Sequence, residues 1–180
     1  MNAGDIMGED LILQTTKGVS MKLIPFTKED FSMIHDFMYP IWHETYDSVI
    51  GAEQTDFLIE RYFSDNGLKE FQSKGYKYFK VVDETTVGIT VIAEKDGDTY
   101  LDKLYLLPAS RGKGYASFIF SELLKLGRDV TLNVNQGNAR AVACYRKNGF
   151  IIDEEEIIDL GDGMINRDYK MRLKADFFKL

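Results

Sequence analysis

The stretch "RGKGYA", residues 111–116, places two glycines and two cations between an apolar run, "YLDKLYLLP", and an amphipathic run, "SFIFSELLKL". The N-terminus of a helix presents free N–H groups and about half a positive charge, and glycines let an anion approach them because they carry no Cβ. Arg111 and Lys113 add mobile positive charge. The hexapeptide therefore predicts a phosphate or pyrophosphate site, although a surface turn with a solubilising cation pair has the same composition.

Two better-known phosphate loops do not match this stretch. The P-loop spacing G-x-x-x-x-G-K-[ST] is absent, and the dinucleotide pattern G-x-G-x-x-G has Ser117 where the third glycine is required. The strands expected before the loop are also antiparallel, whereas the dinucleotide motif belongs to a parallel sheet. The predicted anion site is therefore of another kind.

The strands that position this loop are predicted from alternation of apolar and polar residues. A short strand begins at Met21, and the turn sequences "DET" and "KDGD" indicate hairpins further on. The later strands are expected at residues 76–82, 85–94, 99–107, 129–134, 150–158 and 166–173. The strand–helix–strand crossover over residues 99–134 predicts one parallel pair.

Helices are expected where the apolar period is helical. Thr27 is a plausible N-cap with acidic residues in the first turn. A helical region then follows that is expected to break near Pro40. The expected helical stretches are residues 29–38, 55–63, 67–73, from the glycine loop to about 126, and 138–148. This order predicts an α+β fold with a mixed, mostly antiparallel central sheet flanked by helices.

The composition indicates one globular domain, expected at residues 21–180, with residues 1–20 as an N-terminal extension. The chain has 180 residues, 44% of them hydrophobic, and a net charge of −7. This charge disfavours nucleic acid and suits cationic small molecules.

The single cysteine, Cys144, excludes an internal disulfide. The N-terminus lacks a signal peptide, and no apolar run reaches about 18 residues, so the sequence predicts a cytoplasmic protein without a membrane segment.

A second motif lies downstream in "NARAVACYRKNGF", residues 138–150. R-x-x-G-x-A followed by N-x-x-A-x-x-x-Y-x-x-x-G-F resembles the GNAT N-acetyltransferase superfamily. The positions that match are Arg111, Gly114, Ala116, Asn138, Ala141, Tyr145, Gly149 and Phe150. The early "IWHETYDSVIGAEQTDFLIERYF" and the late "DYKM" resemble a bacterial branch that includes polyamine acetyltransferases. The resemblance extends over about residues 21–173 and implies the acyl-CoA acyltransferase fold.

The resemblance implies acetyl-CoA as cosubstrate and no metal. The pantetheine arm would lie between the strands at 99–107 and 129–134, and a backbone N–H, that of Leu106, would polarise the thioester carbonyl. Core strand packing would equally account for the two leucines of that segment. The implied cofactor-binding residues are Leu104, Leu106, Arg111, Gly112, Lys113, Gly114, Tyr115, Ala116 and Asn138. Asn138 is also a natural helix N-cap.

The implied reaction is direct attack of an amine on the thioester, with much of the acceleration coming from alignment of the two reactants. The leaving thiolate has a pKa of about 8.5, below that of tyrosine near 10, so a neutral phenol can stabilise it by hydrogen bonding. Tyr145 holds the family position for that acid. A packed aromatic on an amphipathic helix is the alternative interpretation.

The implied reaction also needs a general base that takes the proton of the attacking amine. Many family members have a glutamate on the strand before the loop, and this sequence has none there. Asp102 has the same strand parity as Leu104 and Leu106, so we expect it to face the cleft and act through water as a base. Its alternative is a solvated surface residue.

The acceptor wall is expected in the first helices. Trp42, His43, Glu44, Tyr46 and Asp47 cluster there, and aromatics with carboxylates suit a cationic amine. An ordinary amphipathic helix end has the same residues. "HETY" is not H-E-x-x-H, which argues against a zinc site.

The sequence thus predicts an acetyl-CoA-dependent N-acetyltransferase for a small primary amine, polyamine-like acceptors first. The alternatives are a protein lysine or N-terminal amine acetyltransferase, and a non-catalytic acyl-CoA-binding sensor. Similar proteins are often dimers, so a homodimer is also implied.

Overall fold

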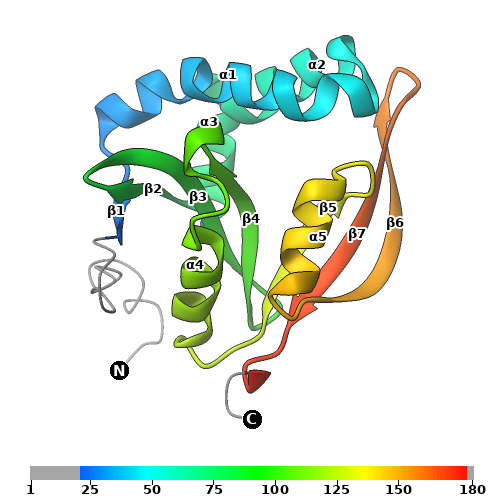
Figure 1. The fold of residues 1–180 in the computed structure, drawn as a ribbon. Helices are drawn as coiled ribbons and strands as arrows, with labels where there is room; N and C mark the ends of the chain where they lie inside the picture. The colour runs from blue at the N-terminus through cyan, green and yellow to red at the C-terminus, as the bar shows by residue number, and fades with distance from the viewer. Residues whose placement is uncertain (1–20, 178–180) are drawn as a thin grey trace.

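A seven-stranded mixed sheet runs through the middle of the molecule (Figure 1). The computed structural model describes residues 21–177, and the predicted extension over residues 1–20 lies outside them. The strands are β1 Met21–Pro25, β2 Lys77–Asp83, β3 Thr85–Lys95, β4 Asp98–Leu106, β5 Val130–Asn135, β6 Ile151–Gly161 and β7 Met164–Leu173. Their order is β1-β2-β3-β4-β5-β7-β6, and only β4 and β5 pair in parallel. The predicted α+β class and the single parallel pair are confirmed.

The helices cover both faces of this sheet. One face carries α1 Lys28–Ile50, α2 Ala52–Phe63 and α3 Asp65–Ser73, and the other carries α4 Tyr115–Leu124 and α5 Ala139–Lys147 (Figure 1). A short 3₁₀ turn, Pro108–Ser110, leads from β4 toward α4. No helix within residues 21–177 combines the length and the apolar character needed to cross a membrane.

Helix α1 begins as predicted but continues through Pro40. Thr27 Oγ1 accepts from the backbone N–H of Asp30, and the Asp30 carboxylate accepts from the Thr27 N–H, which is a capping box. The expected break near Pro40 was wrong, because buried residues on both sides of it, Met38 and Ile41 among them, pack on the same face of the helix. Tertiary packing thus outweighs the one backbone hydrogen bond that proline removes.

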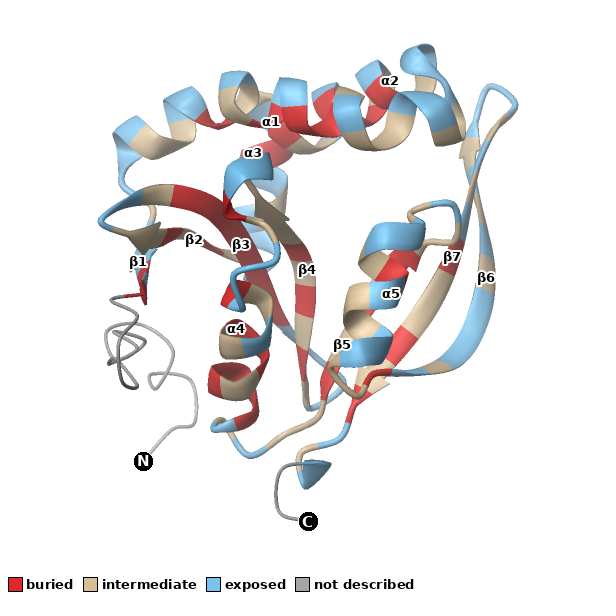
Figure 2. Ribbon diagram, viewed as in Figure 1, coloured by how far each residue is buried: buried red, intermediate tan, exposed pale blue. Residues whose placement is uncertain are grey.

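Two apolar cores lie on opposite faces of the sheet (Figure 2). One lies under α1 to α3 and contains Trp42 and Phe63; the other lies under α4 and α5 and contains Phe120 and Leu132. Alternate residues of a strand face opposite sides of the sheet, so β2, β3 and β4 contribute side chains to both cores.

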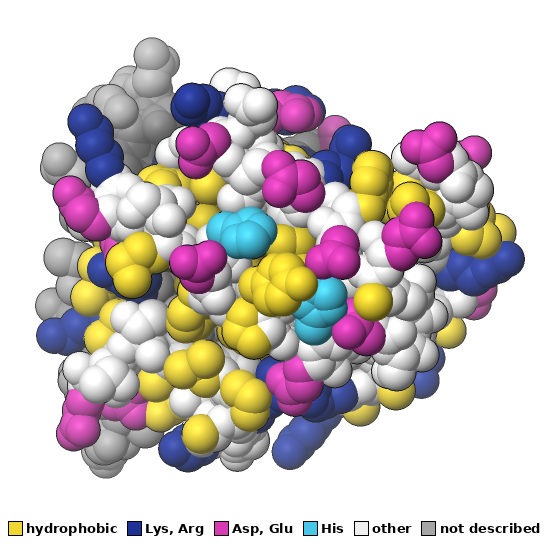
Figure 3. Space-filling view, turned by 90° about the horizontal axis from the view of Figure 1, so that it is seen from above, with side chains coloured by type: hydrophobic (Ala, Val, Ile, Leu, Met, Phe, Trp, Pro, Cys, Tyr) yellow, Lys and Arg dark blue, Asp and Glu magenta, His cyan; other side chains and the backbone are white. Residues whose placement is uncertain are grey.

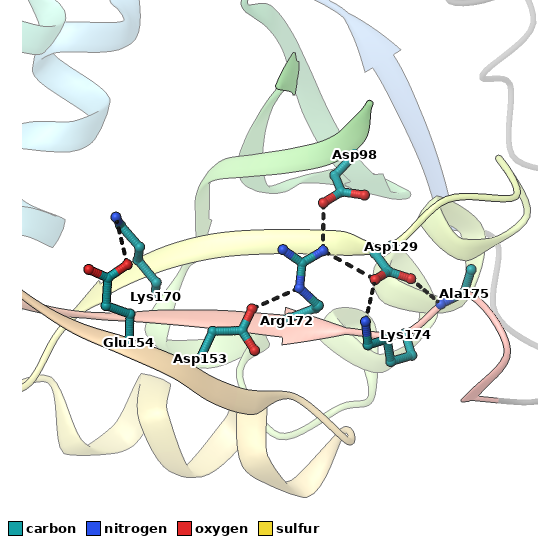
Figure 4. A network of polar contacts seen from close by, with 8 residues as sticks. All are labelled: Asp98, Asp129, Asp153, Glu154, Lys170, Arg172, Lys174 and Ala175. Carbon is teal, nitrogen blue, oxygen red and sulfur yellow. Dashed lines mark hydrogen bonds and ion pairs between the residues drawn. The ribbon is translucent and has the colours of Figure 1, made fainter. Parts of the chain in front are cut away.

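Strands β4 and β5 pair only at their first residues, Thr99 with Val130 and Tyr100 with Thr131. Beyond these pairs the two strands separate. Arg172 of β7 stabilises the closed end of this wedge (Figure 4). Its Nη1 donates to the carboxylates of Asp98 and Asp129, the second at 3.1 Å, and its Nε donates to the Asp153 carboxylate at 2.7 Å. The sheet therefore opens toward α1 and the N-terminus of α4, where the predicted site lies.

Candidate functional site

A cavity of about 600 Å³ occupies the wedge between β4 and β5. Its walls come from α1, α2, β4, the loop before α4, β5, α5 and β7. The predicted site residues that line it are Trp42, Tyr46, Asp102, Leu104, Leu106, Arg111, Gly112, Gly114, Tyr115, Ala116, Asn138 and Tyr145. The structure thus brings together residues that are up to about a hundred positions apart in the chain.

The glycine loop lies against this cavity at the N-terminus of α4. Gly112 and Gly114 have φ of 76° and 88°, a region that side chains rarely adopt. A Cβ added at either position would meet nothing within 4 Å, so the space above the loop is open. Gly114 is the N-cap of α4, and no side chain of residues 21–177 caps the helix there. Free N–H groups beside open space fit a pyrophosphate.

Arg111 is held at the rim of the cavity by Glu44 of α1. Nη1 lies 2.9 Å from Oε1 and Nη2 lies 3.0 Å from Oε2, while Nε donates to the Leu106 carbonyl at 3.0 Å. The hydrogen bond from Arg111 lowers the pKa of Glu44. Glu44 pairs with Arg111 and is not among the residues that line the cavity, so its expected part in the acceptor wall stays a prediction. Lys113 is exposed.

The side chain of Tyr115 points from the first turn of α4 into the core. Its ring is buried in the core under α4, and its hydroxyl donates to the Asp83 carboxylate of β2. An aromatic ring in the first turn of this amphipathic helix is well placed in the core. Tyr115 also lines the cavity, and its expected contact with the cofactor stays a prediction. Its backbone N–H stays at the helix N-terminus.

Part of the β4 backbone presents N–H groups to the wedge. The Leu107 N–H donates to the Val87 carbonyl of β3 at 2.8 Å. Because donors alternate along an antiparallel strand, the N–H groups of Leu104 and Leu106 point away from β3, toward the gap with β5. A Cβ on Gly88, opposite Leu106, would lie 2.3 Å from the Tyr105 carbonyl oxygen. Gly88 therefore lets β3 and β4 approach closely at this point.

Helix α5 supplies Asn138 and Tyr145. Asn138 Oδ1 accepts from the Ala141 N–H at 3.2 Å, so it is the predicted N-cap and also lines the cavity. The Tyr145 ring packs against Phe120 and Phe150, with centroid distances of 5.8 and 5.4 Å. Desolvation by burial raises the pKa of Tyr145, which keeps its hydroxyl protonated at neutral pH.

Asp102 lies at a β-bulge, which interrupts the alternation of side chains on which its expected orientation was based. The register of β4 on β3 shifts between Val91 and Ile92, so that Asp102 has no cross-strand partner. Leu101 before the bulge and Leu104 after it pack on the α4 and α5 side, which shows that the alternation is interrupted. The Asp102 carboxylate forms an ion pair with Lys103, whose Nζ lies 4.3 Å from the centre of the Tyr62 ring. Asp102 still lines the cavity together with Leu104 and Leu106, as expected, and its role as a base stays a prediction.

The cluster at residues 42–47 is divided by the helix. Trp42 and Tyr46 face inward, and the Tyr46 hydroxyl lies 3.1 Å from that of Tyr105. His43 faces outward, with Nδ1 2.9 Å from Asp47 Oδ1 and Nε2 3.2 Å from Asp56 Oδ1. Figure 3 shows both histidines of the chain on this outer surface among acidic side chains. A turn of 100° per residue separates inward from outward positions, so His43 and Asp47 are not part of the cavity wall.

Across residues 21–177, no three His, Cys, Asp or Glu side chains are grouped so that they would hold a metal ion.

Sequence reasoning missed Asp168, the first residue of "DYKM". It lies in β7 between Asn135 of β5 and Glu156 of β6, is 9% exposed and lines the cavity. Desolvation, with a smaller contribution from Glu156, raises the pKa of Asp168 to about 6. An aspartate inside a strand is unusual, and that was the available signal. Three neighbouring amide side chains of β5 and β7 also line the cavity: Asn133, Asn135 and Asn166.

Relatives of this chain are acetyltransferases. It is 28% identical over 125 residues to the peptidyl-lysine N-acetyltransferase YjaB of Salmonella typhimurium, covering 67% of this chain and 80% of that protein. It is 40% identical over 76 residues to an uncharacterized N-acetyltransferase of Mycobacterium bovis, covering 39% of this chain and 49% of that protein. The chain thus spans about half the length of the mycobacterial relative.

Solved structures of the same fold include PaiA N-acetyltransferase from Thermoplasma acidophilum in complex with coenzyme A. Its TM-score is 0.66 at 21% identity, over 86% of this chain and 99% of that one. A spermidine N-acetyltransferase from Vibrio cholerae, in complex with CoA and spermine, has a TM-score of 0.60 at 19% identity, over 89% and 98%. The model of the acetyltransferase (GNAT) family matches residues 35–150, which include the glycine loop and the helix of Tyr145, and the chain belongs to this family.

Proposed function

We propose that the chain transfers the acetyl group of acetyl-CoA directly to a primary alkylamine, with polyamine-like acceptors first. One observation carries the proposal: a single cavity joins the open N-terminus of α4 to a wall of tyrosine, asparagine and aspartate side chains under α1 and α2. The first part suits a pyrophosphate, and the second suits an alkylammonium group. The two reactants would then meet in the wedge between β4 and β5.

Each part of the site has a defined task in this proposal. The amides beginning at Tyr115 hold the pyrophosphate, and the pantetheine arm pairs with the free edge of β4. The Leu106 N–H polarises the thioester carbonyl, because the Leu106 carbonyl is already occupied by Arg111 and its N–H points into the wedge. The Tyr145 hydroxyl stabilises the leaving thiolate.

A protein lysine is the second candidate acceptor. The similarity to a peptidyl-lysine N-acetyltransferase over 67% of this chain favours it. A lysine side chain ends in the same alkylammonium group as a polyamine, so the chemistry of the cavity suits both. At the rim of the cavity, Arg140 Nη1 lies 3.9 Å from Glu44 Oε1. Contacts at this rim would set the preference between a free polyamine and a lysine in a protein chain.

The test is thiol release from acetyl-CoA with a panel of amines. The panel contains spermidine, spermine, a lysine peptide with a blocked N-terminus and a lysine-free peptide with a free one. Turnover with the first two supports the polyamine proposal, and turnover with only one of the peptides replaces it. Binding of acetyl-CoA without turnover on any amine would contradict acetyl transfer and favour a sensor.

A further inference from the structure

Asp168 is a buried carboxylate in the cavity with an unsatisfied oxygen. Asp168 is 9% exposed, and its Oδ1 has no hydrogen-bond partner among the residues that the structure describes. A buried charge without a partner is costly, so such groups are retained where a ligand supplies the partner. The structure therefore points to a cationic or proton-donating ligand at this oxygen.

The direction of the side chain agrees with this. Tyr169 and Met171 pack into the core under α4 and α5. Both are an odd number of residues from Asp168 along β7, so they lie on the face opposite to it. Asp168 therefore faces the other side of the sheet, toward α1 and α2. The cofactor loop lies on the α4 side of the wedge, so an acceptor next to Asp168 would approach the thioester from the opposite side.

We infer that Asp168 receives the alkylammonium group of the acceptor and takes its proton before the nitrogen attacks the thioester. This inference rests on the acetyl transfer proposed above and assigns the base that the sequence had placed at Asp102. Asp102 is less suited, because Lys103 already neutralises it. Asp168 has no such cation on Oδ1.

The carboxylate takes one proton from the ammonium and passes it to solvent, leaving a neutral amine with a free lone pair. The nitrogen forms the C–N bond at the carbonyl carbon, and the C–S bond breaks with its electron pair on sulfur. Nitrogen loses a second proton as the amide forms, and sulfur gains one, so that CoA leaves as a thiol and one proton is released overall.

The surroundings of Asp168 support a base that works near neutral pH. The groups that interact electrostatically with Asp168 are Glu156 on β6, Tyr46 on α1, Tyr62 on α2 and Tyr100 on β4. Lys170, two residues along β7, pairs with Glu156 at 3.3 Å, and Lys103 and Arg140 also line the cavity. None of the four groups that interact with Asp168 is a cation, and burial and Glu156 raise the pKa of Asp168 to about 6. A carboxylate with a pKa this high binds a proton more strongly than an ordinary aspartate and is still ionised at pH 7.5.

Binding of n-butylammonium to the CoA-saturated protein at pH 7.5, followed by NMR, tests the site without turnover. This probe is the end group shared by lysine and polyamines. Wild type should bind it, and Asp168→Asn should weaken binding at least about tenfold. Asp162→Asn, the same change at the exposed tip of the β6–β7 hairpin, should bind as wild type does. Equal binding by Asp168→Asn, loss with Asp102→Asn instead, or no binding by wild type would overturn the inference.

A pH profile of kcat/KM separates the base from a mere binding group. Wild type should lose activity below an apparent pKa of about 6, and Asp168→Asn should lack this acidic limb. An unchanged limb in the variant would overturn the proton-transfer role. If wild type binds n-butylammonium but no amine in the panel releases CoA thiol, acetyl transfer fails while the ammonium site stands.

Discussion

Arg111 and Glu44 form a two-point ion pair across the rim of the cavity, with N–O distances of 2.9 and 3.0 Å. Arg111 belongs to the loop that is proposed to hold pyrophosphate, and Glu44 belongs to α1, on the proposed acceptor side. The pair therefore links the two halves of the site. An anionic cosubstrate must compete with Glu44 for the same guanidinium.

Replacing Glu44 by Gln should strengthen CoA binding. The change removes the competing carboxylate and leaves Arg111 free for phosphate, at a gain of about 1 kcal/mol, or roughly fivefold in Kd. Arg111→Ala should weaken binding by a similar or larger factor. Isothermal titration with CoA at low salt measures both changes. Weaker CoA binding by Glu44→Gln would show that the ion pair supports the loop instead of competing for it.

Replacing Gly114 by Val should greatly weaken CoA binding without unfolding the protein. Valine at φ 88° is strained by about 1–3 kcal/mol, and its side chain occupies the open space above the helix amides. Gly127→Val is the matched control, because Gly127 follows the other end of α4, has φ 77° and also has nothing within 4 Å of an added Cβ. Thermal unfolding should show similar losses for the two variants.

CoA titration then separates them. We expect at least about a hundredfold loss of CoA affinity for Gly114→Val and little change for Gly127→Val. Equal CoA affinity in the two folded variants would rule out the phosphate loop.

Replacing Tyr145 by Phe should lower kcat by roughly a hundredfold, with little change in KM. The phenyl ring keeps its packing against Phe120 and Phe150, so cofactor affinity should remain. The effect should shrink for an acyl donor whose thiol has a lower pKa, because that thiolate needs less stabilisation. Tyr169→Phe is the control, since Tyr169 packs against the same core. Near-normal kcat in the Tyr145 variant, with chemistry as the slow step, would remove Tyr145 from the mechanism.

Replacing Asp168 by Asn should increase stability above pH 6. In the native state Asp168 has a pKa of about 6, against 3.8 for an ordinary aspartate, so between these values the native state holds more protons than the unfolded one. The free energy of unfolding of wild type therefore falls as pH rises from about 4 to about 6. The full difference is at most about 3 kcal/mol.

Urea denaturation of both proteins from pH 4 to pH 8 measures this difference. The variant should be more stable at pH 7–8, and the gap should close near pH 4. A gap that stays constant over this range would mean that Asp168 has an ordinary pKa. Together with lost amine binding, a pH-dependent gain would show a site kept at a cost to stability.

The sequence alone determined the features that depend on residues close together in the chain. The glycines at 112 and 114 predicted an open helix N-terminus, and Thr27 and Asn138 predicted caps that the structure contains. Alternation and turn residues predicted the strands and the α+β class. These signals are local because backbone conformation, capping and pleat depend on a residue and its near neighbours.

Only the tertiary structure decided which side chains share the cavity. The bulge at Asp102 depends on the register with β3, and the pairing of Glu44 with Arg111 joins α1 to a loop 67 residues away. Pro40 stays helical because of contacts with the sheet on both sides. Asp168 becomes a candidate base because the fold buries it between β5 and β6, and burial is a property of the whole fold that no short pattern contains.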